Sequence, residues 1–280
     1  MMSRYSVADI EAFFWEDYPA QYAIADDRFG LFVGDREAAV FGIAFALDAT
    51  VSMVQAAVAA QCNLLITHHP PFWQAPQRFL AAASAASADG AVIFQAAQAV
   101  VALLSLHTNV DCSAPAAAYL LDALGYTQEA VLKPHGQSAD GEAIGLGQLA
   151  RVGKGQASTD IIPTLGQLAK RCRQAFGGYP RVWGSCDRPV QRLAFCSGAG
   201  SEIVPEVIAA CPDCYITGEL HHHESLYLAD EGIALIELGH DRSELPYRQL
   251  LAQSLRTRGV DRELPLVILE PTTEWWVPGA

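Results

Sequence analysis

Two segments of the chain, 150 residues apart, match each other without gaps. Residues 44–67 (AFALDATVSMVQAAVAAQCNLLIT) align with residues 194–217 (AFCSGAGSEIVPEVIAACPDCYIT). Identical residues occur at Ala44, Phe45, Ala49, Val54, Ala59, Ala60, Ile66 and Thr67. Each copy has a short apolar run, an amphipathic segment and a second apolar run, which predicts a strand, a helix and a strand. The repeat therefore predicts a duplicated α/β architecture.

The first copy defines these elements most clearly. VFGIAFAL (40–47) predicts a strand, TVSMVQAAVAAQ (50–61) a helix capped by Asp48 or Thr50, and CNLLIT (62–67) the next strand. AVIFQAAQAVVALLSL (91–106) predicts a buried helix that leads into a strand, because it is shorter than the roughly 20 residues of a membrane span. Strands that alternate with helices predict mainly parallel sheets flanked by helices.

Composition limits which partners and which cellular compartment fit the protein. A net charge of −13 and a pI near 4.9 argue against nucleic acid or an anionic membrane as a partner. The N-terminus lacks the pattern of a secretory signal, and the seven cysteines are scattered, which fits reduced thiols in a soluble cytoplasmic protein. The CPDC segment (211–214) has metal or redox spacing, but a turn between a helix and a strand is the favoured interpretation.

Polar clusters follow the apolar runs of both copies. THHPPFW (67–73) and LHTNVD (106–111) follow the first copy, and TGELHHHES (217–225) and LGHDRSE (238–244) follow the second. Open α/β sheets bind ligands at the carboxyl ends of their strands, where His68 and His69 would lie. His107 with Asp111, and His240 with Glu244, share a spacing of four that places both side chains on one face of a helical turn.

Histidine and carboxylate side chains at strand ends are suitable ligands for divalent metal ions. The set is large enough for two ions if one carboxylate bridges them. HHHE (221–224) is more ambiguous: it fits an exposed helix face or outer contacts of a metal site, and it is not counted among the direct ligands.

In that order along the chain, DRFGLFVGD, ALDAT, LLITHHPPFW, HTNVD, YITGELHHHE and GIALIELGHDRSE resemble the signature segments of the NGG-interacting-factor-three family. These dinuclear-metal-centre, YbgI-like proteins are also called GTP cyclohydrolase I type 2 homologues. The resemblance implies two intertwined α/β domains, a toroidal homohexamer and two divalent metal ions per chain. The metal ligands that it implies are His68, His69, Asp111, His240 and Glu244. His107 matches a motif histidine that is a ligand or a near neighbour, and His221 replaces a lysine of the family pattern.

On this basis we expect three segments. Residues 1–127 form a first α/β domain with the HH and HxxxD ligands, and residues 128–229 form a second α/β domain. Residues 230–280 return to the first domain and carry the HxxxE ligands. The turn-rich stretch from Thr127 marks the first boundary.

Two functions fit this pattern. The first is a metal-dependent hydrolase of a small molecule, with GTP as one named candidate, in which His107 or His223 moves a proton and zinc, iron, manganese, cobalt or nickel activates a water. The alternative is a non-catalytic metal carrier or a regulatory partner protein that forms a ring. Beyond SGAGSE (197–202), the sequence has no clear signal for binding a triphosphate or a purine.

Overall fold

The computed structural model describes residues 4–81, 88–153 and 162–271. They fold into two compact α/β units. Unit 1 contains the described residues up to Val110 and those from Tyr247 onward, and unit 2 contains Asp111–Pro246. The chain thus leaves unit 1 once and later returns to it.

Unit 1 is built on a five-stranded sheet with the strand order β1-β4-β3-β2-β11. Strands β4, β3, β2 and β11 are parallel, and β1 pairs with β4 in the antiparallel direction. The elements are α1 (Val7–Asp17), η1 (Ala20–Tyr22), β1 (Gly30–Val33), β2 (Ile43–Ala46), α2 (Val51–Ala59), β3 (Leu64–Thr67), α3 (Ala88–Gln98), β4 (Ala102–Ser105), α4 (Thr108–Asp111), which runs into unit 2, α10 (Tyr247–Thr257), η3 (Val260–Arg262) and β11 (Leu266–Ile268).

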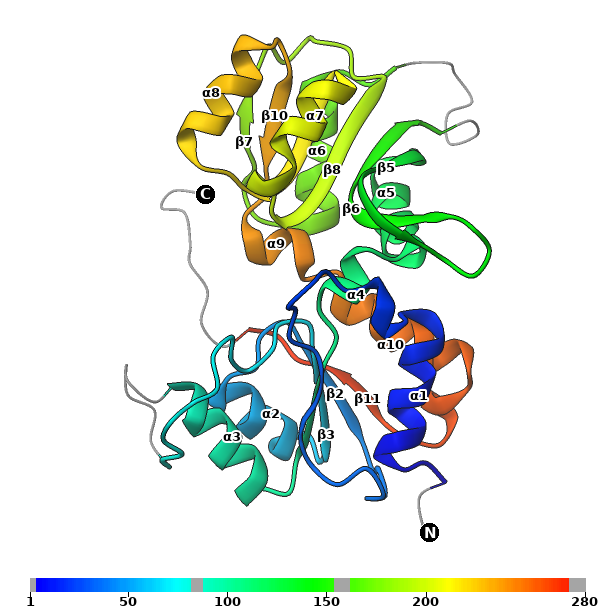
Figure 1. Cartoon of the computed structure of the whole chain (residues 1–280), viewed down its shortest axis with the longest axis vertical. Helices are drawn as coiled ribbons and strands as arrows, with labels where there is room; N and C mark the ends of the chain where they lie inside the picture. The colour runs from blue at the N-terminus through cyan, green and yellow to red at the C-terminus, as the bar shows by residue number, and fades with distance from the viewer. Residues whose placement is uncertain (1–3, 82–87, 154–161, 272–280) are drawn as a thin grey trace. The chain divides into compact units, whose positions relative to one another are not determined.

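Helices cover both faces of this sheet (Figure 1). On one face, Met53 and Val54 of α2 and Val92 of α3 pack on Leu65 and Leu103 of the strands. On the other face, α10 packs on β2 and on α1. Four-residue strands that are buried along their whole length, such as β2, β3 and β4, are typical of parallel sheets covered on both sides.

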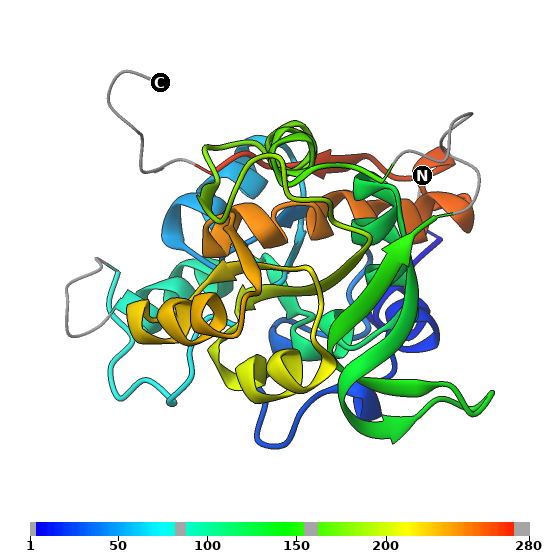
Figure 2. The ribbon, with the colours of Figure 1, turned by 90° about the horizontal axis from the view of Figure 1, so that it is seen from above.

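Unit 2 is built on a six-stranded sheet with the order β5-β6-β8-β9-β10-β7. Its centre, β8-β9-β10, is parallel, whereas β7 and the β5-β6 hairpin, drawn in green in Figure 2, add antiparallel pairs. The elements are α5 (Ala114–Leu124), β5 (Tyr126–Gln137), β6 (Ala143–Val152), α6 (Leu165–Phe176), β7 (Arg181–Trp183), β8 (Arg192–Ala199), η2 (Ser201–Ile203), α7 (Val204–Ala210), β9 (Cys214–Glu219), α8 (His222–Asp230), β10 (Ala234–Glu237) and α9 (His240–Glu244).

Helices also cover both faces of the second sheet. Val207 of α7 and Leu228 of α8 pack on Tyr215 and Leu235, and Phe176 of α6 stacks on Phe195 of β8, with ring centroids 5.9 Å apart. The expected α/β class with two helix-flanked sheets is therefore confirmed. The first sheet is mainly parallel, while in the second sheet the parallel pairs are β8-β9 and β9-β10 and the other pairs are antiparallel.

The internal repeat corresponds to a structural repeat. Ile43 of β2 pairs with Leu64 of β3, and the residues 150 positions later, Leu193 of β8 and Cys214 of β9, pair in the same register. The helix between the strands ends in both copies next to a residue with positive φ, Gln61 (58°) in unit 1 and Cys211 (47°) in unit 2. Sheet register and chain reversal are thus repeated, not only composition.

One glycine is repeated for a steric reason. Gly34 follows β1 and Gly184 follows β7, and both have φ +126°, a backbone conformation that residues with a Cβ rarely adopt. A Cβ added to Gly34 would lie 2.7 Å from the Cβ of Ala102, and one added to Gly184 would lie 3.1 Å from the Cβ of Ala234. Each glycine lets the chain turn closely over the start of a neighbouring strand.

The unit boundaries differ from the boundaries expected after residues 127 and 229, because the chain crosses at 110/111 and at 246/247. Helix α5 precedes the turn-rich stretch but contacts β5 and α6 of unit 2. The turn-rich stretch itself forms most of the β5-β6 hairpin. Strand β10 pairs with β9, so residues 230–246 also belong to unit 2, and the return to unit 1 begins at Tyr247.

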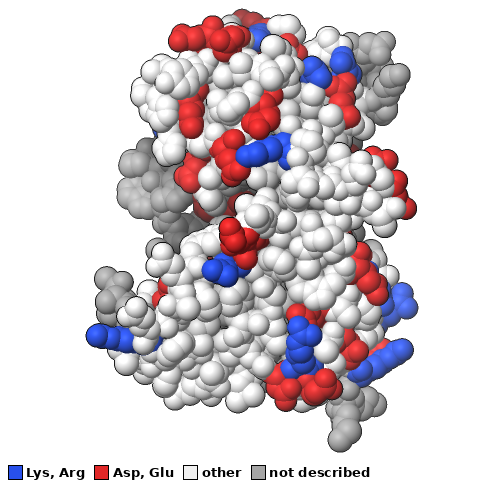
Figure 3. Space-filling view, viewed as in Figure 1, with Lys and Arg blue, Asp and Glu red and all other residues white. Residues whose placement is uncertain are grey.

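Three further features bear on the environment of the protein. Among the described residues, no helix is both long and apolar enough to cross a membrane. None of the seven cysteines, all within the described ranges, forms a disulfide, and CPDC is the turn from α7 to β9. On the face drawn in Figure 3, lysine and arginine side chains are scattered, many beside acidic ones, and form no broad basic patch.

Candidate metal centre

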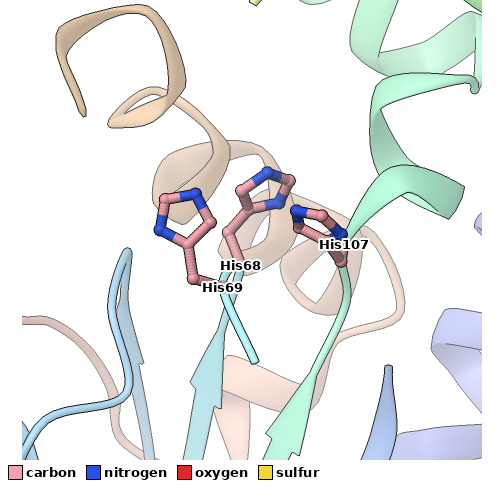
Figure 4. Close-up of side chains that lie close together, drawn as sticks. All are labelled: His68, His69 and His107. Atoms are coloured by element: carbon pink, nitrogen blue, oxygen red, sulfur yellow. The ribbon is translucent and has the colours of Figure 1, made fainter. Parts of the chain in front are cut away.

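Three histidines of unit 1 lie just beyond the carboxyl ends of two neighbouring strands. His68 and His69 follow β3, and His107 follows β4. Because β3 and β4 are parallel neighbours, their carboxyl ends meet at one edge of the sheet. One ring nitrogen from each histidine lies within 4.8 Å of those of the other two, and Figure 4 shows the three rings gathered at this edge. This spacing is suitable for imidazoles that bind one metal ion or a close pair of ions.

The backbone after β3 explains how two adjacent histidines turn to the same side. The N–H groups of His68 and His69 both donate to the carbonyl oxygen of Leu47, at 3.1 and 2.9 Å. The hydroxyl of Thr67 donates to the carbonyl oxygen of His69 at 2.8 Å. These bonds end the strand pleat, in which neighbouring side chains would point to opposite faces.

Each of the three rings has an oxygen acceptor close to its Nδ1 atom. His68 Nδ1 lies 2.9 Å from the carbonyl oxygen of Leu106, His69 Nδ1 lies 2.7 Å from Asp48, and His107 Nδ1 lies 2.7 Å from Asp27. Carbonyl and carboxylate oxygens only accept, so these contacts place the ring proton on Nδ1. The Nε2 atoms then carry the lone pairs that a metal ion or a proton would take.

Asp27 is the more enclosed of the two carboxylate acceptors. Its side chain is 1% exposed and also accepts hydrogen bonds from the backbone N–H of Thr108, at 3.1 Å, and from the hydroxyl of Thr108. Burial alone would raise the pKa of Asp27, but hydrogen bonds from His107 and Thr108 and the charge of His107 outweigh it and lower that pKa. Asp27 is therefore held as a carboxylate that orients His107.

Aromatic side chains restrict the rings further. Tyr247 lies against His68, with ring centroids 4.8 Å apart, and Trp73 meets His107 nearly edge-on at 5.1 Å. Phe72 packs against Phe32 at 5.2 Å. In the segment after the histidine pair, Trp73 thus borders the cluster and Phe72 packs the segment against β1.

The remaining predicted ligands, Asp111, His240 and Glu244, lie in unit 2. His240 and Glu244 begin and end α9, and His240 Nε2 lies 3.3 Å from Glu244 Oε2. Carboxylate oxygens of Asp111 and Glu244 lie within 4.8 Å of each other. Asp111 accepts a hydrogen bond of 2.9 Å from the hydroxyl of Ser197. Unit 2 thus brings together one imidazole and two carboxylates.

The same orientation of the imidazole is found in unit 2. His240 Nδ1 lies 2.9 Å from Glu219, the last residue of β9, which leaves Nε2 toward Glu244. Gly198 makes room for that carboxylate, because a Cβ at this position would collide with Glu244. Cys196 is buried next to the carboxylates, and burial, reinforced by the charges of Asp111 and Glu244, raises the pKa of its thiol to about 12. The thiol is therefore protonated at neutral pH in the metal-free protein.

His223, predicted as a proton carrier, lies elsewhere in unit 2. It is exposed on α8, and its ring stacks on that of His221. The SGAGSE loop contributes Ser201 to this neighbourhood, where its hydroxyl donates to Glu224. Sequence reasoning found the histidines but missed Asp27, Asp48 and Glu219 as their Nδ1 acceptors.

A family model described as DUF34/NIF3 (NGG1p interacting factor 3) matches residues 5–274. The chain belongs to the DUF34/NIF3 family. A relative from Clostridium acetobutylicum named GTP cyclohydrolase 1 type 2 homolog is 27% identical over 231 residues, covering 82% of this chain and 81% of the relative. A protein of the same name from Streptomyces coelicolor is 28% identical over 240 residues, covering 85% and 81%. The resemblance inferred from the motifs is confirmed.

Solved structures show the same fold. A Bacillus cereus protein related to NIF3 superposes with a TM-score of 0.84 at 18% identity and covers 98% of this chain and 99% of its own. Protein ybgI, described as of unknown function, superposes with a TM-score of 0.74 at 19% identity and covers 96% and 99%. At these identities the likeness establishes the fold alone.

Proposed function

We propose that this protein is a dinuclear-metal hydrolase. The observation that carries the proposal is the cluster of His68, His69 and His107, in which three imidazoles converge and each Nδ1 faces an oxygen acceptor. Such acceptors are the usual outer partners of metal-binding histidines. The donor set fits zinc, iron, cobalt or nickel, for which imidazole nitrogen is a suitable ligand, and manganese, for which carboxylate oxygen is one.

Two ions per chain are proposed, with five direct ligands. These ligands are His68, His69, Asp111, His240 and Glu244. When bound, divalent ions would supply Lewis acidity that lowers the pKa of a water molecule and polarises an oxygen of the substrate. Hydrolysis also needs a group that moves a proton, and His107 offers its Nε2 atom while Asp27 holds its Nδ1 proton. His223 stays the second candidate for that role.

The substrate class is a small molecule with a hydrolysable phosphoester, amide or purine ring. GTP is included because relatives carry the name GTP cyclohydrolase 1 type 2 homolog. We also propose a homohexamer, as the family resemblance implies, and a cytoplasmic location, which the N-terminal sequence and the scattered cysteines support. Size-exclusion chromatography with light scattering measures the number of chains in the assembly.

The decisive test combines metal analysis with a substrate screen. Protein purified without chelators is analysed for metal content, then reconstituted and assayed with phosphoesters, nucleotides including GTP, and amides. We expect two ions per chain and turnover that His107→Ala lowers by about 100-fold or more, since general acid–base catalysis contributes about 10²–10⁴-fold. His135→Ala, at an exposed position on β5, is the matched control and should retain both metal and turnover.

Two variants test whether the five ligands act as one centre. If they do, His68→Ala and Glu244→Gln should each disturb the binding of both ions, whereas independent sites would lose one ion apiece. Loaded protein that hydrolyses nothing in the screen but passes metal to an apoprotein acceptor would overturn the hydrolase in favour of a carrier.

A further inference from the structure

A second type of histidine cluster lies on the surface of unit 2, outside the proposed ligand set. It consists of His221, just before α8, and His223 and Glu224 in the first turn of that helix. One ligand atom from each residue lies within 4.8 Å of those of the other two. Both histidines are exposed. Neither histidine is a ligand of the centre proposed above.

The start of the helix brings the two imidazoles together. In the middle of a helix, residues two apart point in different directions. His221 instead has extended backbone angles, φ −68° and ψ 143°, as the residue that precedes the helix. Its ring consequently lies nearly parallel to that of His223, with an angle of 10° between the planes and 5.6 Å between the centroids.

Glu224 is held in place beside these rings. Its carboxylate accepts a hydrogen bond of 3.1 Å from the backbone N–H of His221 and another from the hydroxyl of Ser201. The same carboxylate oxygen lies 3.5 Å from His221 Nδ1. Two nitrogen donors and one oxygen donor are therefore grouped before any ion binds, which reduces the entropy cost of forming a site.

We propose that His221, His223 and Glu224 bind one divalent first-row transition-metal ion, of the zinc or nickel type, on the surface of unit 2. Two imidazoles and one carboxylate suit these ions, whereas calcium and magnesium bind mainly oxygen ligands. Water completes the coordination, since the His221 side chain is 73% exposed. An ion at this position exchanges directly with solvent.

The neighbouring histidine provides a matched control. His222 lies between the two proposed ligands in sequence, but its ring packs near Trp183, with centroids 5.9 Å apart, and it is not part of the cluster. Removal of His222 changes the histidine content of this segment as much as removal of His221 or His223 does. It leaves the three donors in place.

Calorimetric titration with Ni²⁺ tests the proposal in the full-length protein. We expect His221→Ala and His223→Ala each to remove one bound ion per chain, or to weaken that ion at least tenfold, while His222→Ala leaves it unchanged. Electron paramagnetic resonance of bound Cu²⁺ should show nitrogen couplings that both cluster variants reduce and His222→Ala does not. Equal effects of all three variants, or no effect of any, would overturn the site.

His68→Ala separates this site from the dinuclear centre. That variant should keep the surface ion even if the hydrolase proposal fails. If His68→Ala removed the surface ion as well, the ion would belong to the centre and not to a site of its own.

Discussion

The two units repeat one backbone frame but carry different side chains at equivalent strand ends. Aligned by sheet register, His68 of unit 1 corresponds to Gly218 of unit 2, and His69 corresponds to Glu219. Unit 1 presents its imidazoles from loops after β3 and β4, whereas unit 2 presents His240 from the start of α9. Duplication thus supplied the frame, and the candidate ligands diverged separately in each copy.

Packing explains why unit 2 has no histidine at the position of His68. A Cβ at Gly218 would collide with the carbonyl oxygen of Gly198 and would lie 2.8 Å from Ser243 Oγ and 2.9 Å from His240 Cα. Helix α9 therefore occupies the space that a side chain at this position would need. The same close approach brings His240 to the end of β9, where Glu219 accepts its Nδ1 proton.

The largest expected effect is that of His68→Ala on metal binding. His68 is buried and central to the imidazole cluster, and loss even of an outer partner of a ligand costs about 10–100-fold in affinity, so loss of the ligand should exceed about 100-fold. Metal titration of the apoprotein measures the change. Circular dichroism confirms that the variant is folded, and unchanged affinity in a folded variant would contradict the role of His68.

Substitution of the two repeated glycines should lower the free energy of unfolding by different amounts. Gly34→Ala and Gly184→Ala both force an alanine into a strained backbone, for about 1–3 kcal/mol each. Gly34→Ala should cost more, because its Cβ approaches Ala102 more closely than that of Gly184→Ala approaches Ala234. Chemical denaturation measures both losses. Equal losses, or a larger loss for Gly184→Ala, would contradict this steric ranking.

The two carboxylate Nδ1 acceptors should differ in what they control. Asp48→Asn should weaken metal binding by about 10-fold, the lower end for an outer partner of a ligand, because Asp48 orients the proposed ligand His69 but is 54% exposed and can be replaced by water. Asp27→Asn should instead lower turnover with little change in metal affinity, because Asp27 orients His107, the proposed proton carrier, and its side chain is 1% exposed. Metal titration and turnover assays, together with the imidazole nitrogen shifts in NMR spectra, measure the two changes. A larger loss of metal affinity for Asp27→Asn than for Asp48→Asn would make His107 a ligand.

The smallest expected effects are those of the two helix caps. Ser6 caps α1 with Asp9 in a reciprocal pair, and Thr164 caps α6 with Gln167 in the same way. Ser6→Ala and Thr164→Ala should each lower the free energy of unfolding by about 1 kcal/mol. Denaturant titrations should give similar losses of stability for the two variants, and metal titrations should give unchanged affinity. A change in metal affinity in either variant would show coupling between that helix and the site.

Much of the secondary structure was predictable because the sequence patterns that indicate it are local. The match of residues 44–67 with 194–217 predicted both strand, helix, strand units, and Thr50 proved to be one of the two proposed caps. The unit boundaries were not predictable from turn composition, since the residues after Thr127 form the β5-β6 hairpin at one edge of the sheet of unit 2 and do not link the two units. Which elements pack together depends on contacts distant in sequence.

The candidate site was also predictable from the sequence only in part. Adjacent histidines at a strand end are visible as a motif, as are the pairs with a spacing of four. Asp27 lies 80 residues before His107 and Asp48 lies 21 residues before His69, so no fixed spacing indicates either acceptor. Asp48 was visible only as a possible helix cap. The useful signal was its position directly after a buried strand that neighbours β3.

The crossing of the chain between the units also sets an order of synthesis. Within the part of the chain that the structure describes, unit 2 is one continuous stretch, whereas the sheet of unit 1 needs β11, which pairs with β2 and is made after that stretch. On the ribosome the second unit can complete its sheet while the first still exposes the edge of β2 and lacks the cover of α10. The half made first is therefore the half that finishes folding last.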